Sequence, residues 1–500
     1  MKHRFFLFFL LACVSFATAQ NRTSRMDSSV TTTHQVTIKG QRITYTATAG
    51  KQPVWDEKGH PIAGLFYIYY EKTGVTDRAN RPLVFSFNGG PGAASCWMHL
   101  GYTGPRRVNI DDEGYPVQPY GIRENPYSIL DVADIVYIEP VNTGFSRAAS
   151  DTVSKTNFFG VNADIKYLAS WISTFVSRKN RWTSAKYLIG ESYGTTRVSG
   201  LALELQEVHW MYLNGVVLVS PTNLGIVRTG PVLAANMLPY MAATAWYHKK
   251  MPADLQQKDL TAVLPEVESF TINELIPGLT QGGFIEPQKR QQLAARMARY
   301  AGISEKVILE HNLNIPMPFF WKELLRDKGY NIGRLDSRYL GIDRQEAGER
   351  PDYAAENTSW QHSFTPAINL YLREELNYKT DLDYYIAGHT QPWDRQNRNT
   401  DSTAEDLRQA MAMNPYLHLM VQSGYYDGAC DYFNAKYNMW QMDPSGKLKD
   451  RMEWHGYRSG HMMYLRTEDL ATSTDDIRNF IKKSTPKPGQ PAQYRTGKGF

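Results

Sequence analysis

Residues 190–194 read Gly-Glu-Ser-Tyr-Gly, so that Ser192 stands between two glycines. An apolar run at 186–189 precedes this segment, and a helical pattern over 195–205 follows it. This is the setting of a nucleophile elbow, a sharp turn from strand to helix that presents a serine hydroxyl above a sheet. Glycines suit such a turn because its backbone segments crowd one another. We therefore predict Ser192 as a nucleophile; with 37 glycines in the chain, a chance match in a surface turn is the alternative.

A serine hydroxyl is a weak nucleophile, so it needs a histidine base and a carboxylate that orients the histidine. On this kind of sheet the three residues follow in the order Ser, Asp, His. Asp427 lies just beyond the apolar run 416–421, and His461 lies in a small-residue loop before the last helical pattern. These two residues are the predicted acid and base. The rivals that the pattern leaves open are Asp431 for the acid and His455 or His418 for the base.

A second glycine-rich segment, residues 88–92, reads Asn-Gly-Gly-Pro-Gly and follows the apolar run 82–87. In an α/β-hydrolase the loop at this place supplies part of the oxyanion hole. One N–H of the loop and the N–H of Tyr193 would stabilise the oxyanion of a tetrahedral intermediate. A plain turn is the alternative.

The pattern of apolar residues predicts the helices and strands that hold these residues in place. Helical patterns over 158–176 and 195–205 place apolar residues at three- and four-residue steps. Alternating segments at 35–47 and 64–70 predict antiparallel strands at the leading edge of a sheet. Short apolar runs, typical of buried parallel strands, are residues 82–87, 133–138, 186–189, 215–219 and 416–421. Together they predict an α/β fold with a mostly parallel central sheet flanked by helices.

The segment 223–399 breaks this rhythm, because it is long, mostly helical or irregular in pattern, and rich in Pro, Trp and Tyr. We interpret it as a largely helical insertion, a cap or lid. It would divide the core into a first part at 20–222 and a second part at 400–484. The basic, Gly- and Pro-rich end at 485–500 is typical of a flexible tail.

The chain opens with Lys2 and Arg4, continues with an apolar run at 5–16 and reaches an Ala-x-Ala site. This is the layout of a cleaved secretory signal. We therefore predict residues 1–19 as a signal peptide and an exported protein, periplasmic or secreted. A lipid anchor on Cys13 is the less favoured alternative.

Composition and missing motifs exclude several classes of function. A charge of +5 spread over 55 basic and 50 acidic residues does not indicate a nucleic-acid partner. After the signal no stretch approaches about 18 uninterrupted apolar residues, so we expect no transmembrane segment. The phosphate-binding, His-Glu-x-x-His and Cys-x-x-Cys patterns are absent, so we predict no cofactor and no metal. Whether Cys96 and Cys430 pair is left open.

Together these motifs resemble those of the serine carboxypeptidase family. The matching segments are residues 88–92, 125–128 (Asn-Pro-Tyr-Ser), 139–146 (Glu-Pro-Val-Asn-Thr-Gly-Phe-Ser) and 190–194. The resemblance covers roughly 82–221 and 415–481, and residues 238–250 look like its bacterial branch. It implies an α/β-hydrolase fold, a triad of Ser192, Asp427 and His461, and an oxyanion hole from the backbones of Gly90 and Tyr193.

The resemblance also implies that Asn88 and Glu191 bind the terminal carboxylate of a peptide. Two carboxyl groups share a hydrogen bond only when one of them holds a proton, so Glu191 should be neutral. Affinity should then fall as pH rises, and we expect an acidic working range.

Four positions depart from the family pattern. Ala93 stands in place of a cysteine, Tyr425 in place of an aspartate and Tyr464 in place of a proline. Tyr102 stands in place of a glutamate and weakens the acidic cluster that supports carboxylate recognition.

We therefore predict an exported serine-type carboxypeptidase that releases C-terminal amino acids from peptides through an acyl-enzyme on Ser192. An esterase or acyltransferase on the same fold is the alternative, and Tyr102 favours it. A catalytically silent binding protein is a third hypothesis, against which the intact Ser, Asp, His order argues. The resemblance leaves a homodimer open.

Overall fold

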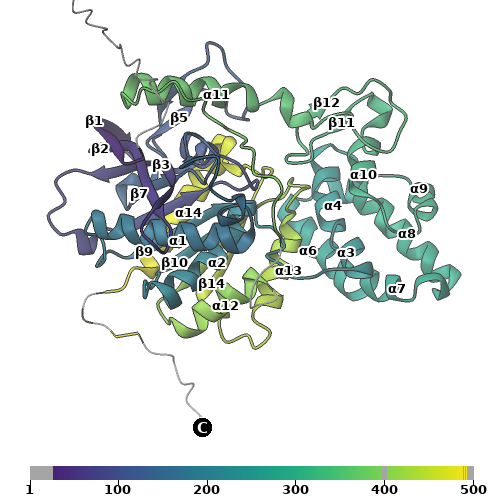
Figure 1. Cartoon of the computed structure of the whole chain (residues 1–500). Coiled ribbons are helices and arrows are strands. Elements are labelled where there is room, and N and C mark those ends of the chain that lie inside the picture. Colours follow the sequence, from purple (N-terminus) through teal and green to yellow (C-terminus); the bar gives the residue numbers. More distant parts are fainter. Residues whose placement is uncertain (1–25, 396–401, 488, 490, 493–500) are drawn as a thin grey trace, which may run out of the picture.

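The computed structural model describes residues 26–395, 402–487, 489 and 491–492 (Figure 1). The predicted signal peptide, the alternative lipid site at Cys13 and most of the predicted tail lie outside the described residues. No helix in the described ranges is both long and apolar enough to cross a membrane.

A ten-stranded sheet forms the centre of the molecule. In spatial order its strands are β1 (Ser28–Ile38), β2 (Gln41–Trp55), β3 (Pro61–Lys72), β7 (Asp134–Ile138), β4 (Leu83–Phe87), β9 (Lys186–Glu191), β10 (Gly215–Val219), β13 (His418–Gly424) and β14 (Met452–Tyr457), while β8 (Arg147–Ala148) pairs with β3. The strands from β7 to β14 run parallel, whereas β1, β2 and β3 are antiparallel. The predicted mostly parallel sheet with an antiparallel leading edge is confirmed.

One predicted strand, 35–47, is wrong. The structure has a hairpin there, in which β1 ends at Ile38 and β2 begins at Gln41. Lys39 and Gly40, the two residues between them, have φ values of 48° and 78°. Positive φ at both positions is typical of the two-residue turns whose twist matches that of paired strands. The alternation changes phase across this turn, from apolar residues at 36 and 38 to apolar residues at 43, 45 and 47, and the four residues between them are the signal that the prediction of one strand overlooked.

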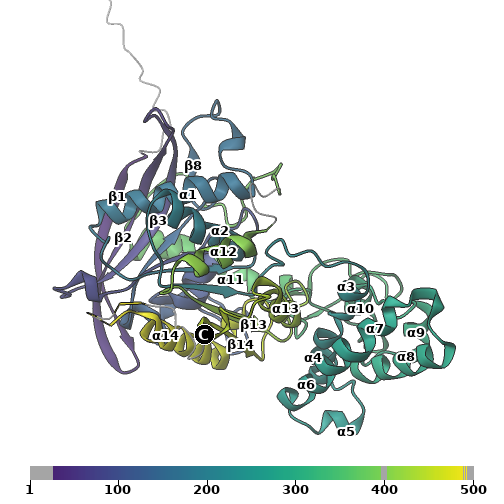
Figure 2. The ribbon, with the colours of Figure 1, turned by 90° about the horizontal axis from the view of Figure 1, so that it is seen from below.

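Helices cover both faces of the sheet (Figure 2). On one face α1 (Val161–Arg178), α2 (Tyr193–Val208) and α12 (Thr403–Met413) pack into one hydrophobic cluster with the sheet. On the other face α11 (Gln361–Leu370) and α14 (Thr467–Ser484) contribute to a second cluster. The sheet is therefore buried on both sides, as a parallel sheet requires.

A group of helices beside the sheet has its own hydrophobic core (Figure 1). Its members are α3 (Gly230–Ala235), α4 (Leu238–Tyr247), α5 (Ala253–Gln256), α6 (Leu260–Phe270), α7 (Ile276–Thr280), α8 (Pro287–Ala301), α9 (Glu305–Glu310) and α10 (Met317–Glu323). Phe364 and Tyr371, later in the same segment, instead belong to the core of the sheet. The boundaries at 223 and 399 stay a prediction, and the packing divides the segment between them into two parts.

The remaining elements are short. They are α13 (Tyr432–Met442) and the two-stranded pairs β5 (Arg106–Val108) with β6 (Ile122–Glu124) and β11 (Asn331–Ile332) with β12 (Leu340–Gly341).

A fully buried ion pair joins α1 to α2. Nε of Arg197 lies 2.7 Å from Oδ2 of Asp164, and both side chains are almost completely shielded from water. The same guanidinium donates through Nη1 to the backbone oxygen of Asn88, at 2.7 Å. One buried cation therefore holds together two helices and the loop that follows β4.

Replacing Arg197 by Met should lower the free energy of unfolding by about 3–5 kcal/mol, because the Asp164 carboxylate would stay buried without its partner. Urea unfolding followed by tryptophan fluorescence measures this loss. The matched control is Arg178→Met, which breaks the exposed pair with Asp27 and should cost about 1 kcal/mol or less. Equal losses in the two variants would contradict the role given to the buried pair.

Candidate active site

Ser192 lies at a sharp turn between the last residue of β9 and the first residue of α2. Its φ of 57° and ψ of −126° are rare for a residue with a side chain. The Ser192 N–H donates to the backbone oxygen of Val219, at 3.0 Å, which holds the turn against β10. Rare backbone angles that the surrounding structure holds in place are typical of functional sites.

Backbone atoms crowd both glycines of the turn, Gly190 more severely than Gly194. A Cβ on Gly190 would lie 2.2 Å from the backbone oxygen of Gly194. A Cβ on Gly194 would lie 3.0 Å from the backbone oxygen of Asn88. Backbone crowding, the physical reason that the sequence pattern implied, is therefore present at both positions.

Asp427 and His461 form a buried pair. Nδ1 of His461 lies 2.7 Å from Oδ2 of Asp427, whose side chain is fully buried. The other carboxylate oxygen accepts the N–H groups of Ala429 and Cys430, at 2.8 and 2.9 Å. Asp427 thus holds the ring so that its other nitrogen, Nε2, faces away from the carboxylate.

The rival residues have other partners. Asp431 caps the N-terminus of α13 and accepts the N–H of Asn434. His455 faces Glu453 and Asp476, and His418 is the first residue of β13. The geometry therefore pairs Asp427 with His461, and not with the other candidates.

The pKa of His461 reflects two opposing effects. Burial lowers it, but the Asp427 carboxylate outweighs burial and raises the pKa well above its usual value. His461 therefore tends to keep a proton in mildly acidic solution. This tendency opposes the acidic working range, because a general base must be neutral.

The backbone of the loop at 88–92 lies against the turn that carries Ser192. A Cβ on Gly89 would lie 2.4 Å from the backbone nitrogen of Tyr193. Gly90 has a φ of 102°, a conformation that residues with a side chain rarely adopt. The two predicted oxyanion donors, the N–H groups of Gly90 and Tyr193, thus belong to backbone segments in close contact.

Asn88 and Glu191 are also brought together. Nδ2 of Asn88 donates to Oε2 of Glu191, at 3.1 Å, and Oδ1 of Asn88 accepts the N–H of Met98, at 2.9 Å. Oε1 of Glu191 lies 4.0 Å from Nε2 of His461. Burial raises the pKa of Glu191 to about 7, so that a neutral carboxyl group stands beside the histidine in acidic solution.

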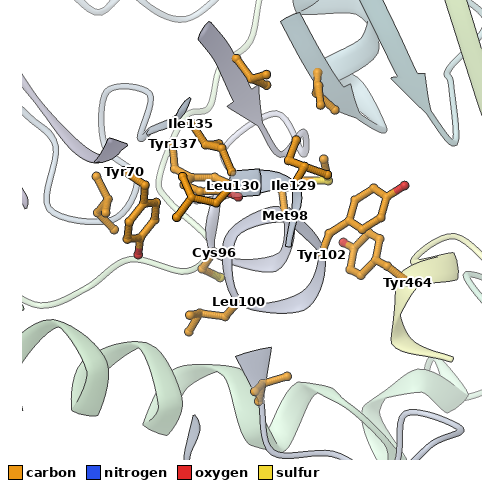
Figure 3. Close-up of a cluster of buried hydrophobic side chains, with 14 of the residues drawn as sticks. Tyr70, Cys96, Met98, Leu100, Tyr102, Ile129, Leu130, Ile135, Tyr137 and Tyr464 are labelled. Carbon is orange, nitrogen blue, oxygen red and sulfur yellow. The ribbon is translucent and has the colours of Figure 1, made fainter. Parts of the chain in front are cut away.

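Sequence reasoning missed the role of Tyr464. Its hydroxyl donates to Oε2 of Glu191, and its ring stacks on Tyr102 with the centroids 4.7 Å apart (Figure 3). Both tyrosines are positions at which the sequence departs from the family pattern. The signal in the sequence was that both positions differ from the family pattern. It did not show that the two tyrosines contact each other, because they lie more than 350 residues apart in the chain.

The two cysteines of the described chain are free thiols, so they do not pair with each other. Cys96 is buried in the core. Cys430 lies beside the triad, and its sulfur, one ring nitrogen of His461 and one oxygen of Asp427 lie within 4.8 Å of one another.

The model of the serine carboxypeptidase family matches residues 51–253. Serine carboxypeptidase-like 36 of Arabidopsis thaliana is 31% identical over 165 residues, which are 32% of each chain. Serine carboxypeptidase-like 31 of the same plant is 28% identical over 203 residues, 39% of this chain and 38% of the relative. The chain thus spans about a third of the length of the curated relatives it matches.

The fold extends beyond the matched segment. The crystal structure of Kex1, a prohormone-processing carboxypeptidase from Saccharomyces cerevisiae, aligns with 88% of this chain and 91% of its own, with a TM-score of 0.53. The sequence identity over this alignment is 14%, so the likeness concerns the fold alone. That fold is the α/β-hydrolase fold, as the sequence predicted.

Replacing Asp427 by Asn should slow acylation of Ser192 by about 10⁴-fold, because the amide would hold the wrong tautomer of His461. The rate of labelling by a fluorophosphonate measures acylation, and Ser192→Ala should abolish the label. The matched control is Asp431→Asn, which changes the rival acid. Rapid labelling of Asp427→Asn together with slow labelling of Asp431→Asn would reverse the assignment.

Proposed function

We propose that the protein is a serine-type carboxypeptidase that releases C-terminal amino acids from peptides. The observation that carries the proposal is the buried carboxyl of Glu191, held by Asn88 and adjacent in the chain to the nucleophile. A site for a terminal carboxylate next to Ser192 selects the last peptide bond of a chain. The match of residues 51–253 to the model of the serine carboxypeptidase family supports the same activity.

The geometry fits an acyl-enzyme mechanism. His461 takes the proton of the Ser192 hydroxyl as the oxygen attacks the carbonyl carbon of the last peptide bond. The N–H groups of Gly90 and Tyr193 stabilise the resulting oxyanion. His461 then protonates the leaving amine, which departs as the free amino acid. Water, deprotonated by the same histidine, releases the shortened peptide from Ser192.

The terminal carboxylate would bind between Asn88 and Glu191. The Asn88 amide donates one hydrogen to Glu191 and would donate its second hydrogen to the substrate, in place of its contact with the Tyr464 hydroxyl. A neutral Glu191 donates its own proton to the substrate carboxylate, whereas an ionised Glu191 repels it. Recognition is therefore strong below the pKa of about 7 and is lost as pH rises through it.

His461 and Glu191 are close enough to compete for one proton. With the proton on His461 the site is an inactive ion pair, and with the proton on Glu191 both groups are ready for catalysis. A bound carboxylate favours the second arrangement, because it is repelled by an ionised Glu191. Substrate binding would thus free His461 to act as a base, despite its raised pKa.

The proposal also includes export, the family branch, the pH range and the oligomeric state. Export to the periplasm or the medium rests on residues 1–19, outside the described part of the chain. The bacterial branch rests on residues 238–250, while the relatives reported above come from a plant. The acidic working range and the homodimer are likewise untested.

An esterase or acyltransferase is the second candidate. Tyr102 favours it, because this residue brings no second carboxyl group to the site and its hydroxyl donates to Gln422, at 2.7 Å. Such an enzyme would keep the triad but would not require a free carboxylate on its substrate.

An N-blocked dipeptide with a free C-terminus should be cleaved far faster than its C-terminal amide below about pH 7, because only the free acid can share the proton of Glu191. Amino-acid release between about pH 4 and 8 measures this preference. Equal cleavage of acid and amide, or turnover of simple esters alone, would favour the second candidate.

Replacing Glu191 by Gln should remove the loss of free-acid kcat/KM that occurs as pH rises through about 7, because an amide stays neutral and keeps a donor. The pH profile of kcat/KM tests this. Glu139→Gln is the matched control, since burial also raises the pKa of Glu139 to about 7 while its partners are Ser95 and Tyr384. Disappearance of the alkaline limb only in Glu139→Gln would refute the assignment.

A further inference from the structure

The two oxygens of Glu191 have different surroundings. Oε2 accepts the Tyr464 hydroxyl and the Asn88 amide. Oε1 lies 4.0 Å from Nε2 of His461 and is therefore the oxygen on the side of the catalytic base. The carboxyl group thus has one oxygen occupied by donors and one oxygen that faces the reaction.

The position of Tyr464 is determined from several elements. Gly101 makes room for its ring, because a Cβ there would lie 2.7 Å from Cε2 of Tyr464. The Tyr102 ring stacks on it at an interplanar angle of 14° (Figure 3). Tyr102 donates to Gln422, whose amide donates in turn to Tyr457 at 2.9 Å. The hydroxyl of Tyr464 has little freedom to leave Glu191, since the ring is fully buried.

We propose that Tyr464 is a positioning residue that keeps Oε2 of Glu191 an acceptor, so that the proton of the neutral carboxyl lies on Oε1 and points toward the terminal carboxylate of the peptide. The inference rests on the proposed carboxypeptidase activity. It gives a task to a residue at which the chain departs from the family pattern, and it shows how carboxylate recognition persists without a glutamate at position 102.

The chemistry of a carboxylic acid supports this assignment. A protonated carboxyl oxygen becomes a donor, while the other oxygen keeps its full capacity as an acceptor. Two donors aimed at Oε2 therefore favour the form with the proton on Oε1. Without the Tyr464 hydroxyl, Oε2 could carry the proton, and the group would present an acceptor to a substrate that is itself an anion.

The hydroxyl also influences the ionisation of Glu191. A hydrogen bond to the carboxylate stabilises its charged form, so loss of the Tyr464 hydroxyl should raise the pKa of Glu191 further above about 7. The other titratable groups that face Glu191 are His461, Asp427, Tyr102 and Cys96. Tyr464→Phe leaves all four in place, so that a change in the pH profile reports on the missing hydroxyl.

Tyr464→Phe should lower kcat/KM for the free-acid dipeptide by about tenfold at low pH, the effect of one lost hydrogen bond to a carboxyl group. Its alkaline limb should move upward by about one pH unit. Cleavage of a simple ester by the same variant should not fall, because the ester has no carboxylate to bind and a higher pKa of Glu191 leaves His461 neutral. The pair of substrates separates recognition from catalysis.

Tyr137→Phe is the matched control for deleting a buried hydroxyl. Tyr137 bonds Thr103 at 2.6 Å and belongs to the same hydrophobic cluster as Tyr464, but it makes no hydrogen bond to Glu191 (Figure 3). It should leave the alkaline limb unchanged. Equal losses on acid and ester in Tyr464→Phe, without movement of the limb, would overturn the proposal.

A second measurement is independent of activity. Infrared difference spectra of the Ser192→Ala protein between low and high pH should contain the band of a protonated carboxyl group. The band is assigned to Glu191 if it disappears when Glu191 is also replaced by Gln. The titration midpoint of this band should rise when Tyr464 is replaced by Phe, and an unchanged midpoint would overturn the inference. This measurement needs no turnover, so it tests the role of Tyr464 separately from the proposed activity. An unchanged midpoint counts against the role of Tyr464 alone, and loss of the wild-type preference for free acids counts against the proposed activity alone.

Discussion

Backbone crowding at the turn between β9 and α2 is the constraint on which the rest of the site depends. A Cβ on Gly190 would lie 2.2 Å from the backbone oxygen of Gly194, and a Cβ on Gly89, in the loop after β4, would lie 2.4 Å from the backbone nitrogen of Tyr193. This crowding brings Ser192, the loop at 88–92 and the carboxyl of Glu191 close together. The buried guanidinium of Arg197 maintains the arrangement, because it binds the backbone of the loop and an aspartate of α1.

Exclusion of water then decides where the protons lie. Glu191 is pushed toward its neutral form by burial, whereas His461 is pushed toward its charged form by Asp427. Two groups 4.0 Å apart with opposite tendencies form a coupled pair that an anionic substrate can rearrange. The same burial that raises the cost of charge on Glu191 thus supports the proposed binding of a terminal carboxylate.

Much of the fold was predictable because its signals are local. The apolar runs that became β4, β7, β9, β10 and β13, and the periodic segments that became α1 and α2, each depend on neighbouring residues alone. The hairpin at Lys39 and Gly40 was missed although residues 39–42 interrupt the alternation, because the alternating segments on the two sides of this short turn were treated as one strand. The packing of α11 against the sheet was also missed. The predicted insertion has a similar composition throughout, yet its first helices form a core of their own while α11 packs on the sheet.

For the site, local sequence patterns predicted a serine in a strand-to-helix turn, a glycine-rich loop after an earlier strand, and the order Ser, Asp, His. The resemblance to the serine carboxypeptidases added Asn88 and Glu191. Only the tertiary structure decided between Asp427 and Asp431, and only it joined Tyr102 and Tyr464 to the carboxyl of Glu191. The difference comes from distance along the chain. A turn depends on adjacent residues, whereas a hydrogen bond between residues hundreds of positions apart forms only after the sheet has brought its strand ends together.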